Sequence, residues 1–424
     1  MITLVVNFFN TGFLIYFCYK CINNKIDTSL LWISLSILYF INIPLLYDSL
    51  FSLFQTNYEL FLVKANENWE MGTFKNLQLI SFSSAIFNII MYITYLLVNP
   101  TFIVNRAKKK KLKIVNNEKI GEYFQLNIIP WWVCILISYC GLVLFFVNNG
   151  ISGITQMGIV EWYASRTHNR LLNFISPFLL LLSSFPIFKA LVEKKYLMGV
   201  ICSIPFVIVG YISSARSLII SAIFYILYYY ILKLKSLSLK NVMVLIIFAI
   251  FISTILTVWR GDLEMMYPNT KDMSYSDLFY AYNISEFFTT LGNNTLRLIF
   301  TGFYRFEAYD VTLALADYKY HQGWGSLHPT ILGWAYIDLG KYFWLFALYI
   351  GVFMGICDRI RLSCKPIINL IFLSFIFSFS TIAVRGSVQY AYSTLIYPLI
   401  ILILYKLLVR GKKTAKISTR HFHH

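Results

Sequence analysis

Charged residues are scarce in this sequence. Asp, Glu, Lys and Arg make up 13% of its 424 residues, whereas hydrophobic residues make up 58%. Soluble domains carry about 25% charged residues. The chain therefore carries too few charged residues to be soluble, and its composition excludes a soluble globular protein.

The sequence also lacks the motifs of several enzyme classes. It contains no P-loop, no GxSxG, no HExxH, no Asp-x-Asp pair and no His-x-x-x-Asp acyltransferase motif. Nucleotide-powered transport and metal-dependent hydrolysis are therefore unsupported, and neither a cofactor nor a metal is expected. The seven cysteines all fall in predicted helices or on the predicted cytoplasmic side, so an external disulfide framework is not expected either.

Long apolar runs recur along the whole chain. A helix needs about 20 residues to cross about 30 Å of hydrocarbon, and most of the runs reach that length. The first run has no basic start and no small-residue cleavage site, so it is interpreted as a retained helix. The runs are 2–19, 30–52, 77–99, 131–148, 172–191, 197–213, 215–232, 241–259, 330–356, 366–384 and 388–408. They predict an all-α, polytopic membrane protein with about 11 transmembrane helices in one membrane domain, 1–424.

The basic residues fall mainly in alternate connections between these runs. Six connections hold 24 of the 36 Lys and Arg residues. The positive-inside rule assigns these connections to the cytoplasm, with the N-terminus periplasmic and the C-terminus cytoplasmic. The net charge of +17 is thus interpreted as a topology signal, and nucleic acid is not an expected partner. The six connections are 20–29, 100–130, 189–196, 233–240, 357–366 and 406–424.

One external loop, 260–329, is much longer than the others. It holds 5 basic and 8 acidic residues, so its arginines are not part of a general cationic coat. Apolar residues return every three or four positions over 274–291 and 295–316, which predicts amphipathic helices on the membrane surface. The run 330–356 exceeds the length of one span, and Gly340 is expected to separate a short helix, 329–338, from the spanning part.

Arginines at the outer membrane boundary are the main candidates for binding an anion, because a buried cation there is costly without one. Arg216 lies in a tight turn, Tyr211–Ser217, and Arg385 lies in a second short outer turn. Each could contact a lipid phosphate. The alternative is that each side chain only extends to the membrane interface.

Arg297 and Arg305 form a second candidate pair. They are eight residues apart, which on a helix places them about 12 Å apart and within about 80° of each other. Two guanidinium groups at that separation could converge on a diphosphate. Pairing with Glu307 or Asp310 is the alternative.

His328 is the strongest candidate base. Pro329 is expected to be the first residue of a helix and His328 its cap, where the helix dipole keeps an imidazole neutral and able to accept a proton. A purely structural capping role stays open. His168 and His321 are weaker candidates.

Several of these segments together resemble one known family. They are the large external loop near the C-terminal third, Tyr163-Ala-Ser-Arg166, Ser214-Ala-Arg-Ser217, and Gly325-Ser-Leu-His-Pro-Thr-Ile-Leu-Gly333 followed by Tyr336-Ile-Asp-Leu-Gly340. In this layout the chain resembles the O-antigen polymerase (Wzy) family, whose architecture is GT-C-like. The resemblance implies a metal-independent glycosyltransferase of the bacterial inner membrane. Such an enzyme transfers a growing glycan from undecaprenyl pyrophosphate to a newly flipped lipid-linked repeat unit, making O-antigen or capsular polysaccharide.

The resemblance also implies roles for the candidate residues. Catalysis would fall to His328, as the base for the attacking sugar hydroxyl, and to Arg216, which stabilises the departing diphosphate. Substrate binding would fall to Arg166, Arg297, Arg305, Arg385, Trp324 and Tyr336. Trp334 is a further aromatic candidate for stacking on a sugar. The implied partners are the lipid-linked donor and acceptor, membrane lipid and a chain-length regulator protein.

Two other functions stay open. A lipid-linked oligosaccharide flippase or exporter would perform no chemistry, but such transporters usually have short loops and charges within the spans. An O-antigen ligase would use the same donor with a lipid A core acceptor, and the sequence separates it poorly from a polymerase.

Overall fold

The structure, a computed structural model, describes most of the predicted spans. It covers residues 2–24, 28–54, 72–98, 117–149, 170–212, 216–233 and 329–386, together with parts of 391–406. All regular secondary structure in these ranges is helical. Five helical segments are long and apolar enough to cross a membrane, so the described chain has the character of a helical membrane protein. They are Ile2–Ile22, Ser29–Leu46, Leu77–Val98, Gly340–Leu362 and Pro366–Arg385.

Most predicted runs in the described ranges form one helix each, because each is a continuous apolar stretch. The run 30–52 forms α2 and α3 joined by a π-helical turn, η1. The helices and their bounds are α1 (Ile2–Asn24), α2 (Thr28–Ile37), η1 (Leu38–Asn42), α3 (Ile43–Phe54), α4 (Gly72–Val98), α7 (Trp131–Asn149), α12 (Tyr196–Ile212), α13 (Arg216–Lys233) and α20 (Pro366–Arg385).

The run 172–191 is not the single helix that was predicted. It forms α10 (Arg170–Leu182) and α11 (Phe185–Glu193), with a turn at Ser183 and Ser184 between them. Each serine hydroxyl donates to the carbonyl oxygen three residues earlier, over 2.5 Å and 2.6 Å. Pro186 lies in the first turn of α11, where it has no N–H to donate to the Leu182 carbonyl oxygen and its ring would clash with that carbonyl in a continuous helix, which explains why the apolar run is interrupted here.

The predicted division of 330–356 is confirmed. A short helix, α18 (Thr330–Leu339), precedes a 3-10 turn, η7 (Gly340–Tyr342), and the long α19 (Trp344–Leu362). Gly340 separates them with φ 53° and ψ −127°, a backbone conformation that is strongly disfavoured for residues with a Cβ.

Several predictions lie outside the described residues. These are the run 241–259, the loop 260–328 and the two amphipathic helices within that loop. The total of about eleven spans and the GT-C-like architecture therefore stay predictions.

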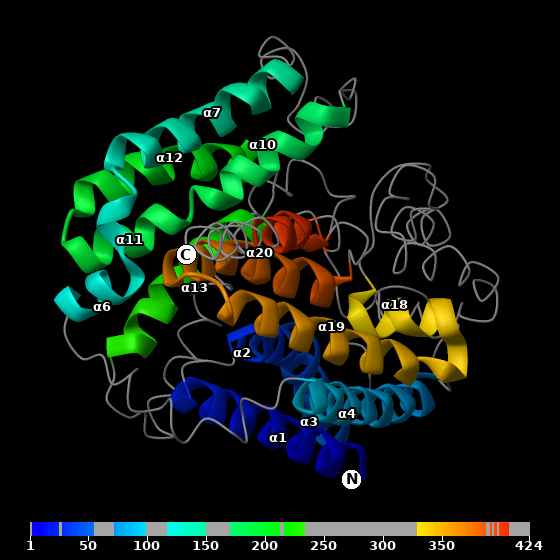
Figure 1. Cartoon of the computed structure of the whole chain (residues 1–424). Helices are drawn as coiled ribbons and strands as arrows, with labels where there is room; N and C mark the ends of the chain where they lie inside the picture. The colour runs from blue at the N-terminus through cyan, green and yellow to red at the C-terminus, as the bar shows by residue number, and fades with distance from the viewer. Residues whose placement is uncertain are drawn as a thin grey trace, which may run out of the picture.

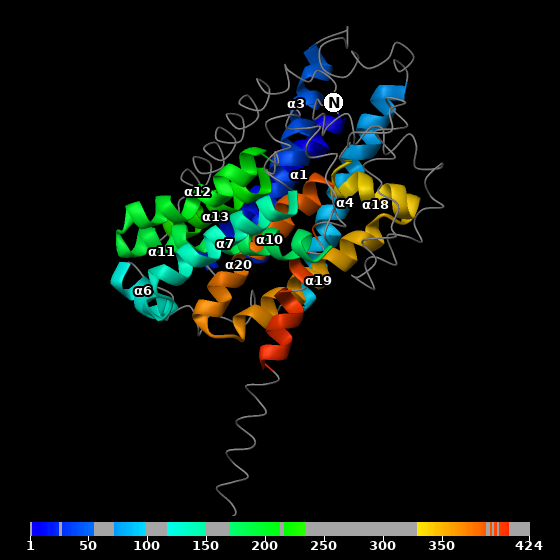
Figure 2. The same ribbon diagram turned by 90° about the horizontal axis from the view of Figure 1, so that it is seen from above.

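The helices form a bundle in which α18 and α6 (Asn117–Phe124) lie at opposite ends (Figures 1 and 2). These are called the α18 end and the α6 end. Helix α19 runs from the α18 end to the α6 end, and α20 returns. Helix α20 contacts α2, α10, α13, α18 and α19, and it is buried on nearly all sides. A helix that is apolar all round belongs at the centre of such a bundle.

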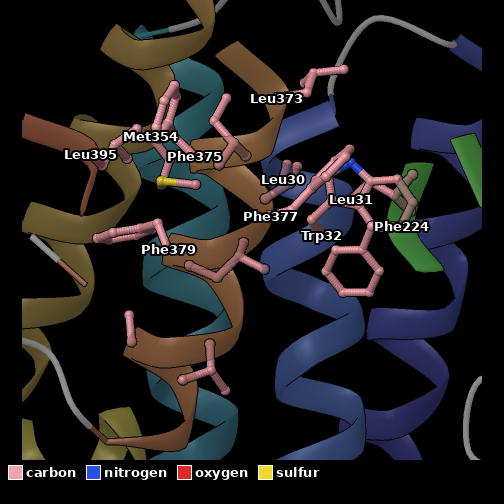
Figure 3. Packing of buried hydrophobic residues seen from close by; sticks show 14 of the residues in the cluster. Leu30, Leu31, Trp32, Phe224, Met354, Leu373, Phe375, Phe377, Phe379 and Leu395 are labelled. Atoms are coloured by element: carbon pink, nitrogen blue, oxygen red, sulfur yellow. The ribbon is translucent and has the colours of Figure 1, made fainter. Parts of the chain in front are cut away.

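Aromatic residues fix how α20 packs against its neighbours. Figure 3 shows Trp32 of α2 beside Phe377 of α20 and Phe224 of α13. The Trp32 ring centroid lies 4.5 Å from that of Phe224 and 4.9 Å from that of Phe377. Stacked and edge-to-face pairs of this kind each contribute about 0.5–1.5 kcal/mol beyond the burial of their area. Because Phe377 of α20 contacts both Trp32 and Phe224, rotation of α20 would disrupt its contacts with α2 and α13 together.

Two glycines bring α19 into backbone contact with α4. Gly351 and Gly355 have the small-xxx-small spacing that allows close approach of membrane helices. A Cβ on Gly351 would overlap the Thr94 hydroxyl and the Met91 carbonyl oxygen. A Cβ on Gly355 would lie 3.1 Å from the Cβ of Val98. Any side chain at 351 must therefore push the two helices apart.

We expect Gly351→Ala to destabilise the protein, because the Met91 carbonyl belongs to the α4 backbone and cannot turn aside. Overpacking of this kind costs about 1–3 kcal/mol. The measurement is the melting temperature in detergent. Gly12→Ala is the matched control, since nothing lies within 4 Å of a Cβ there. Equal melting temperatures for the two variants would contradict the predicted clash.

Candidate functional site

The end of α20 meets the start of α18 through their backbones. A Cβ built on Gly386 would lie 2.6 Å from the Thr330 nitrogen and 2.9 Å from both the nitrogen and Cδ of Pro329. Only glycine allows this approach, and Gly386 has φ 116°. We call the contact among Gly386, Pro329 and Thr330 the Gly386 joint. It places Arg385, the half-buried last residue of α20, beside the segment that follows His328.

Arg216 lies at the same end of the bundle. Helix α12 ends at Ile212 and α13 begins at Arg216, so the two helices lie three residues apart in the chain, as the two apolar runs predicted. Helices α13 and α20 are antiparallel, and the Tyr225 hydroxyl is 2.8 Å from that of Ser374. Arg216 precedes Tyr225 by nine residues, and Ala383 follows Ser374 by nine. At 1.5 Å per residue, Arg216 and Ala383 each lie about 14 Å along their helices from this contact. Arg385 follows Ala383 by two residues, so the backbones at Arg216 and Arg385 lie at nearly the same position along the helix axes.

The expected cap of α18 was wrong by one residue. Pro329, not His328, holds the N-cap position, and Thr330 begins the helix. Proline is compatible with the position because the first backbone N–H groups of a helix have no partner within it. His328 itself lies outside the described residues, and its role as a base stays a prediction.

The two aromatic candidates in α18 differ in exposure. Trp334 is 1% exposed and packs in the core, so it is not available to stack on a sugar. Its indole N–H has no hydrogen-bond partner among the described residues. Tyr336 is half-buried and its ring centroid lies 6.3 Å from that of Phe343. Of the two, only Tyr336 stays a candidate for substrate contact.

The remaining candidates fall outside the described residues. Of the predicted set, the structure brings Arg385 next to the start of α18, and the backbone at Arg216 lies at the same end of the bundle. The candidates outside the described ranges are Arg166, Arg297, Arg305, Trp324 and His328.

A buried ion pair at the α6 end was not anticipated. Arg361 is one of the basic residues of the connection 357–366 that was assigned to the cytoplasm, but it is 1% exposed and Asp358 is 0% exposed. The Arg361 Nη2 lies 2.7 Å from Asp358 Oδ1, and Nε donates to the same oxygen over 3.0 Å. Arg361 Nη1 also donates to the amide oxygen of Asn369 on α20. The sequence signal for this buried pair was the spacing of three residues between an Asp and an Arg at the end of an apolar helix.

The carboxylate of Asp358 joins two further helices to α19. It accepts hydrogen bonds from the Tyr95 hydroxyl of α4 at 2.6 Å, and from the Ser29 hydroxyl at 2.6 Å and backbone N–H at 3.3 Å. Ser29 lies in the first turn of α2, so the carboxylate caps that helix from another element. We call these five residues, Ser29, Tyr95, Asp358, Arg361 and Asn369, the Asp358 cluster. Each charge in it has a partner, as a buried ion pair requires.

A second buried cation is Lys189, one of the basic residues of the connection 189–196. Its Nζ donates to the carbonyl oxygens of Leu126 and Ile129 and lies 2.8 Å from Glu193 Oε1. These contacts fasten the 3-10 turn η4 (Leu126–Ile128), which follows α6, to α11. Partial burial of Glu193 raises its pKa, but hydrogen bonds from Lys189 and Trp131 outweigh this and keep the pKa below the ordinary glutamate value.

A cluster of amides and hydroxyls joins α1 to α3 and α4. The Asn7 amide donates to the hydroxyls of Ser49 at 2.6 Å and Ser81 at 3.0 Å. The Asn88 amide donates to the Asn10 carbonyl oxygen over 3.0 Å. Side-chain hydrogen bonds between apolar helices hold such helices together in a membrane. The cluster explains how α1, which is largely exposed, stays attached to the bundle.

Comparisons of the chain with protein-family models, with curated proteins and with solved structures found no match. The functional argument therefore rests on the chemistry of the chain itself.

We expect the double variant Asp358→Leu, Arg361→Met to lose less stability than the two single variants lose when their losses are added. Removing one partner of a buried pair leaves an uncompensated charge and costs about 3–5 kcal/mol, whereas replacing both partners costs much less. The measurement is the free energy of unfolding in mixed detergent micelles. Arg359→Met is the control, because Arg359 is exposed on the same helix. Additive losses in the double variant would show that the two charges are not coupled.

Proposed function

We propose that this chain polymerises undecaprenyl-pyrophosphate-linked oligosaccharide repeat units into O-antigen or capsular polysaccharide. On this proposal it is a metal-independent glycosyltransferase of the bacterial inner membrane, similar to the O-antigen polymerases, and the α18 end faces the periplasm. The observation that supports the proposal is that Arg216, Arg385 and the start of α18 lie at the same end of the bundle.

The distribution of charge supports this orientation. Exposed cations at the α6 end include Arg359, Lys365, Lys194 and Lys195. An excess of basic residues is typical of cytoplasmic connections. The α6 end is therefore proposed to face the cytoplasm, with the C-terminus on that side and the N-terminus in the periplasm.

The position of Arg216 favours an anionic ligand. Arg216 is the first residue of α13, where the helix dipole is positive and a further cation is unfavourable. An anion at that helix end would be attracted by the dipole, by unpaired backbone N–H groups and by the guanidinium together. A diphosphate on a lipid headgroup is an anion of this kind, held at the depth where a membrane helix ends.

The proposed reaction transfers a glycan between two lipids. A hydroxyl of the acceptor sugar attacks the anomeric carbon of the donor, the bond from that carbon to the diphosphate oxygen breaks, and His328 accepts the hydroxyl proton. The leaving diphosphate carries the bonding electron pair away. Arg216 and Arg385 stabilise that developing negative charge without a metal. Cleavage of the sugar-diphosphate bond supplies the driving force, so no nucleotide is needed.

Arg297 and Arg305 are proposed to complete the diphosphate site from the large loop. Arg166 is proposed to hold the second lipid or its glycan, while Trp324 and Tyr336 contact sugars. The partners are the lipid-linked donor and acceptor, membrane lipid and a chain-length regulator protein.

A flippase is less well supported by the arrangement of the buried charges. In the described part of the chain, Asp358 and Arg361 form hydrogen bonds with each other and with Ser29, Tyr95 and Asn369. Charged groups that serve translocation usually line a hydrated pathway. Here they fasten four helices together instead.

We expect impermeant maleimide to distinguish the two ends. In a cysteine-free background, Lys341→Cys at the α18 end should react in intact spheroplasts, and Lys365→Cys should react only after permeabilisation. Both positions are exposed, so access to them depends on the side of the membrane. The reverse labelling pattern would rule out the proposal, because a flipped donor could not reach Arg216 or Arg385.

We expect the purified protein to extend synthetic undecaprenyl-pyrophosphate-linked repeat units into a ladder of products, with and without chelator. Arg216→Lys and His328→Ala should insert normally yet abolish chain growth, because lysine lacks the planar pairing of arginine and alanine cannot accept a proton.

Arg359→Lys is the control, since Arg359 is exposed at the opposite end of the bundle. Failure of the wild-type protein to lengthen any repeat unit would refute the polymerase proposal. Transfer only to a lipid A core acceptor would identify a ligase instead.

A further inference from the structure

Two neighbouring helices begin with exposed aromatic residues at the α6 end. Trp132, in the first turn of α7, is 66% exposed, and Tyr196, the first residue of α12, is 60% exposed. The two helices pack side by side (Figure 1). Both start near the same point, because the Trp131 indole N–H donates to the carboxylate of Glu193, just before α12. They therefore run in the same direction from the α6 end.

The two exposed rings lie at nearly the same level of the bundle. The Tyr139 hydroxyl of α7 donates to the Ile201 carbonyl oxygen of α12 over 3.4 Å. Trp132 precedes Tyr139 by seven residues, and Tyr196 precedes Ile201 by five. At 1.5 Å per residue these backbones lie about 11 Å and about 8 Å from the contact along their helices. Trp and Tyr at one level of a membrane protein are typical of the membrane–water interface.

The exposed faces of α7 and α12 beyond these rings carry no charge. Neither helix contains a charged residue. The apolar stretches Trp131–Val147 and Tyr196–Gly210 are also shorter than the five candidate spans, so the residues that flank them are drawn toward the lipid headgroups. The exposed residues of this face are Leu136, Cys140, Val143 and Val147 of α7, and Leu197, Val200, Ile204 and Val207 of α12.

The turn between α11 and α12 is positively charged. Lys194 and Lys195 are both exposed and directly precede Tyr196. Glu193 cannot neutralise them, because one of its carboxylate oxygens lies 2.8 Å from Lys189 Nζ and the other lies 3.5 Å from Lys195 Nζ. Segment 189–196 has three lysines and one glutamate, so two positive charges remain. These charges lie beside the exposed aromatic rings and complement an anion at the interface.

The backbone of Lys194 is unusual for a lysine. Lys194 ends α11 in the left-handed conformation, with φ 59° and ψ 26°. Helices that end in this way usually have glycine or asparagine at that position, because a Cβ is disfavoured there. The negative end of the α11 dipole favours a cation, but a lysine one turn earlier would supply it without this strain. A strained residue is evidence for a functional constraint.

We propose that the turn 194–196 is a binding site for an anionic phospholipid in the leaflet at the α6 end. Lys194 and Lys195 contact the phosphate of the headgroup, Trp132 and Tyr196 lie beneath it, and the acyl chains follow the exposed faces of α7 and α12. Neutral lipid would fit the apolar faces alone, but the two lysines favour negative charge. This inference does not rest on the proposed function.

The test is the quenching of Trp132 fluorescence by brominated lipids in vesicles that contain the full-length protein. The contribution of Trp132 is obtained as the difference between the wild type and Trp132→Phe, because the chain has nine tryptophans. Phosphatidylglycerol and phosphatidylcholine are mixed at one fixed ratio, and either one or the other carries the bromine. A lysine close to an anionic membrane surface changes binding by about fivefold. We expect the site to prefer phosphatidylglycerol by between about fivefold and about twentyfold.

The double variant Lys194→Asn, Lys195→Gln should reduce this preference to less than about twofold. Asparagine is chosen because it accepts the left-handed conformation at position 194. Lys119→Gln is the matched control. Lys119 is exposed on α6 at the same end, but Glu118 and Glu122 of the same helix offset its charge, so its loss should leave the preference unchanged. Both variants should keep the wild-type melting temperature, because the substituted side chains are exposed.

Three results would overturn the proposal. Equal quenching by the two lipids in the wild type would show that the turn does not select an anionic headgroup. A preference that survives the loss of both lysines would place the selective site elsewhere. If neither lipid quenches Trp132, protein covers this face, as in a dimer of the chain. If the double variant does not fold, the wild type decides, because a preference that depends on these lysines must fall at high salt.

Discussion

The position of α20 is the constraint on which the other features of the bundle depend. This helix is buried on nearly all sides, so packing determines both its rotation and its position along the axis of the bundle. At the α6 end, Asn369 accepts a hydrogen bond from Arg361. At the α18 end, Gly386 abuts Pro329 and Thr330. A helix fixed at both ends cannot slide or rotate without breaking one of these contacts, and Arg385 is held in place accordingly.

The two ends of α20 are fixed by different kinds of interaction. The Asp358 cluster relies on charge and hydrogen bonds in a buried setting, where unpaired groups are costly. The Gly386 joint relies on close backbone approach and contains no charged partner. The first arrangement removes charge from participation in binding, because each group already has a partner. The Gly386 joint lies directly beside Arg385, which on the proposed function would meet the diphosphate.

Some features could be predicted from the sequence because they depend on local composition. Apolar runs predicted α1, α4, α7 and α20, since about 20 apolar residues form a helix in almost any membrane setting. Gly340 was correctly expected to divide 330–356, because glycine is favoured where φ is positive. The close succession of α12 and α13 along the chain was also predicted, because two apolar runs left almost no residues between them. The interruption at Ser183 and Ser184 was missed, because hydropathy alone does not register that Pro186 is incompatible with a continuous helix through Leu182.

The sequence by itself determined a helical membrane protein, most of the described helix boundaries and an arginine at two helix ends. Only the tertiary structure decided which charges are accessible. Arg361 and Lys189 fall in basic connections in the sequence, but both are buried, and their partners include Asn369 of the next helix and the backbone carbonyls of Leu126 and Ile129. The contact of Gly386 with Thr330 likewise joins residues far apart along the chain. Pairing and close approach depend on distances in space, which residue spacing along one helix does not specify.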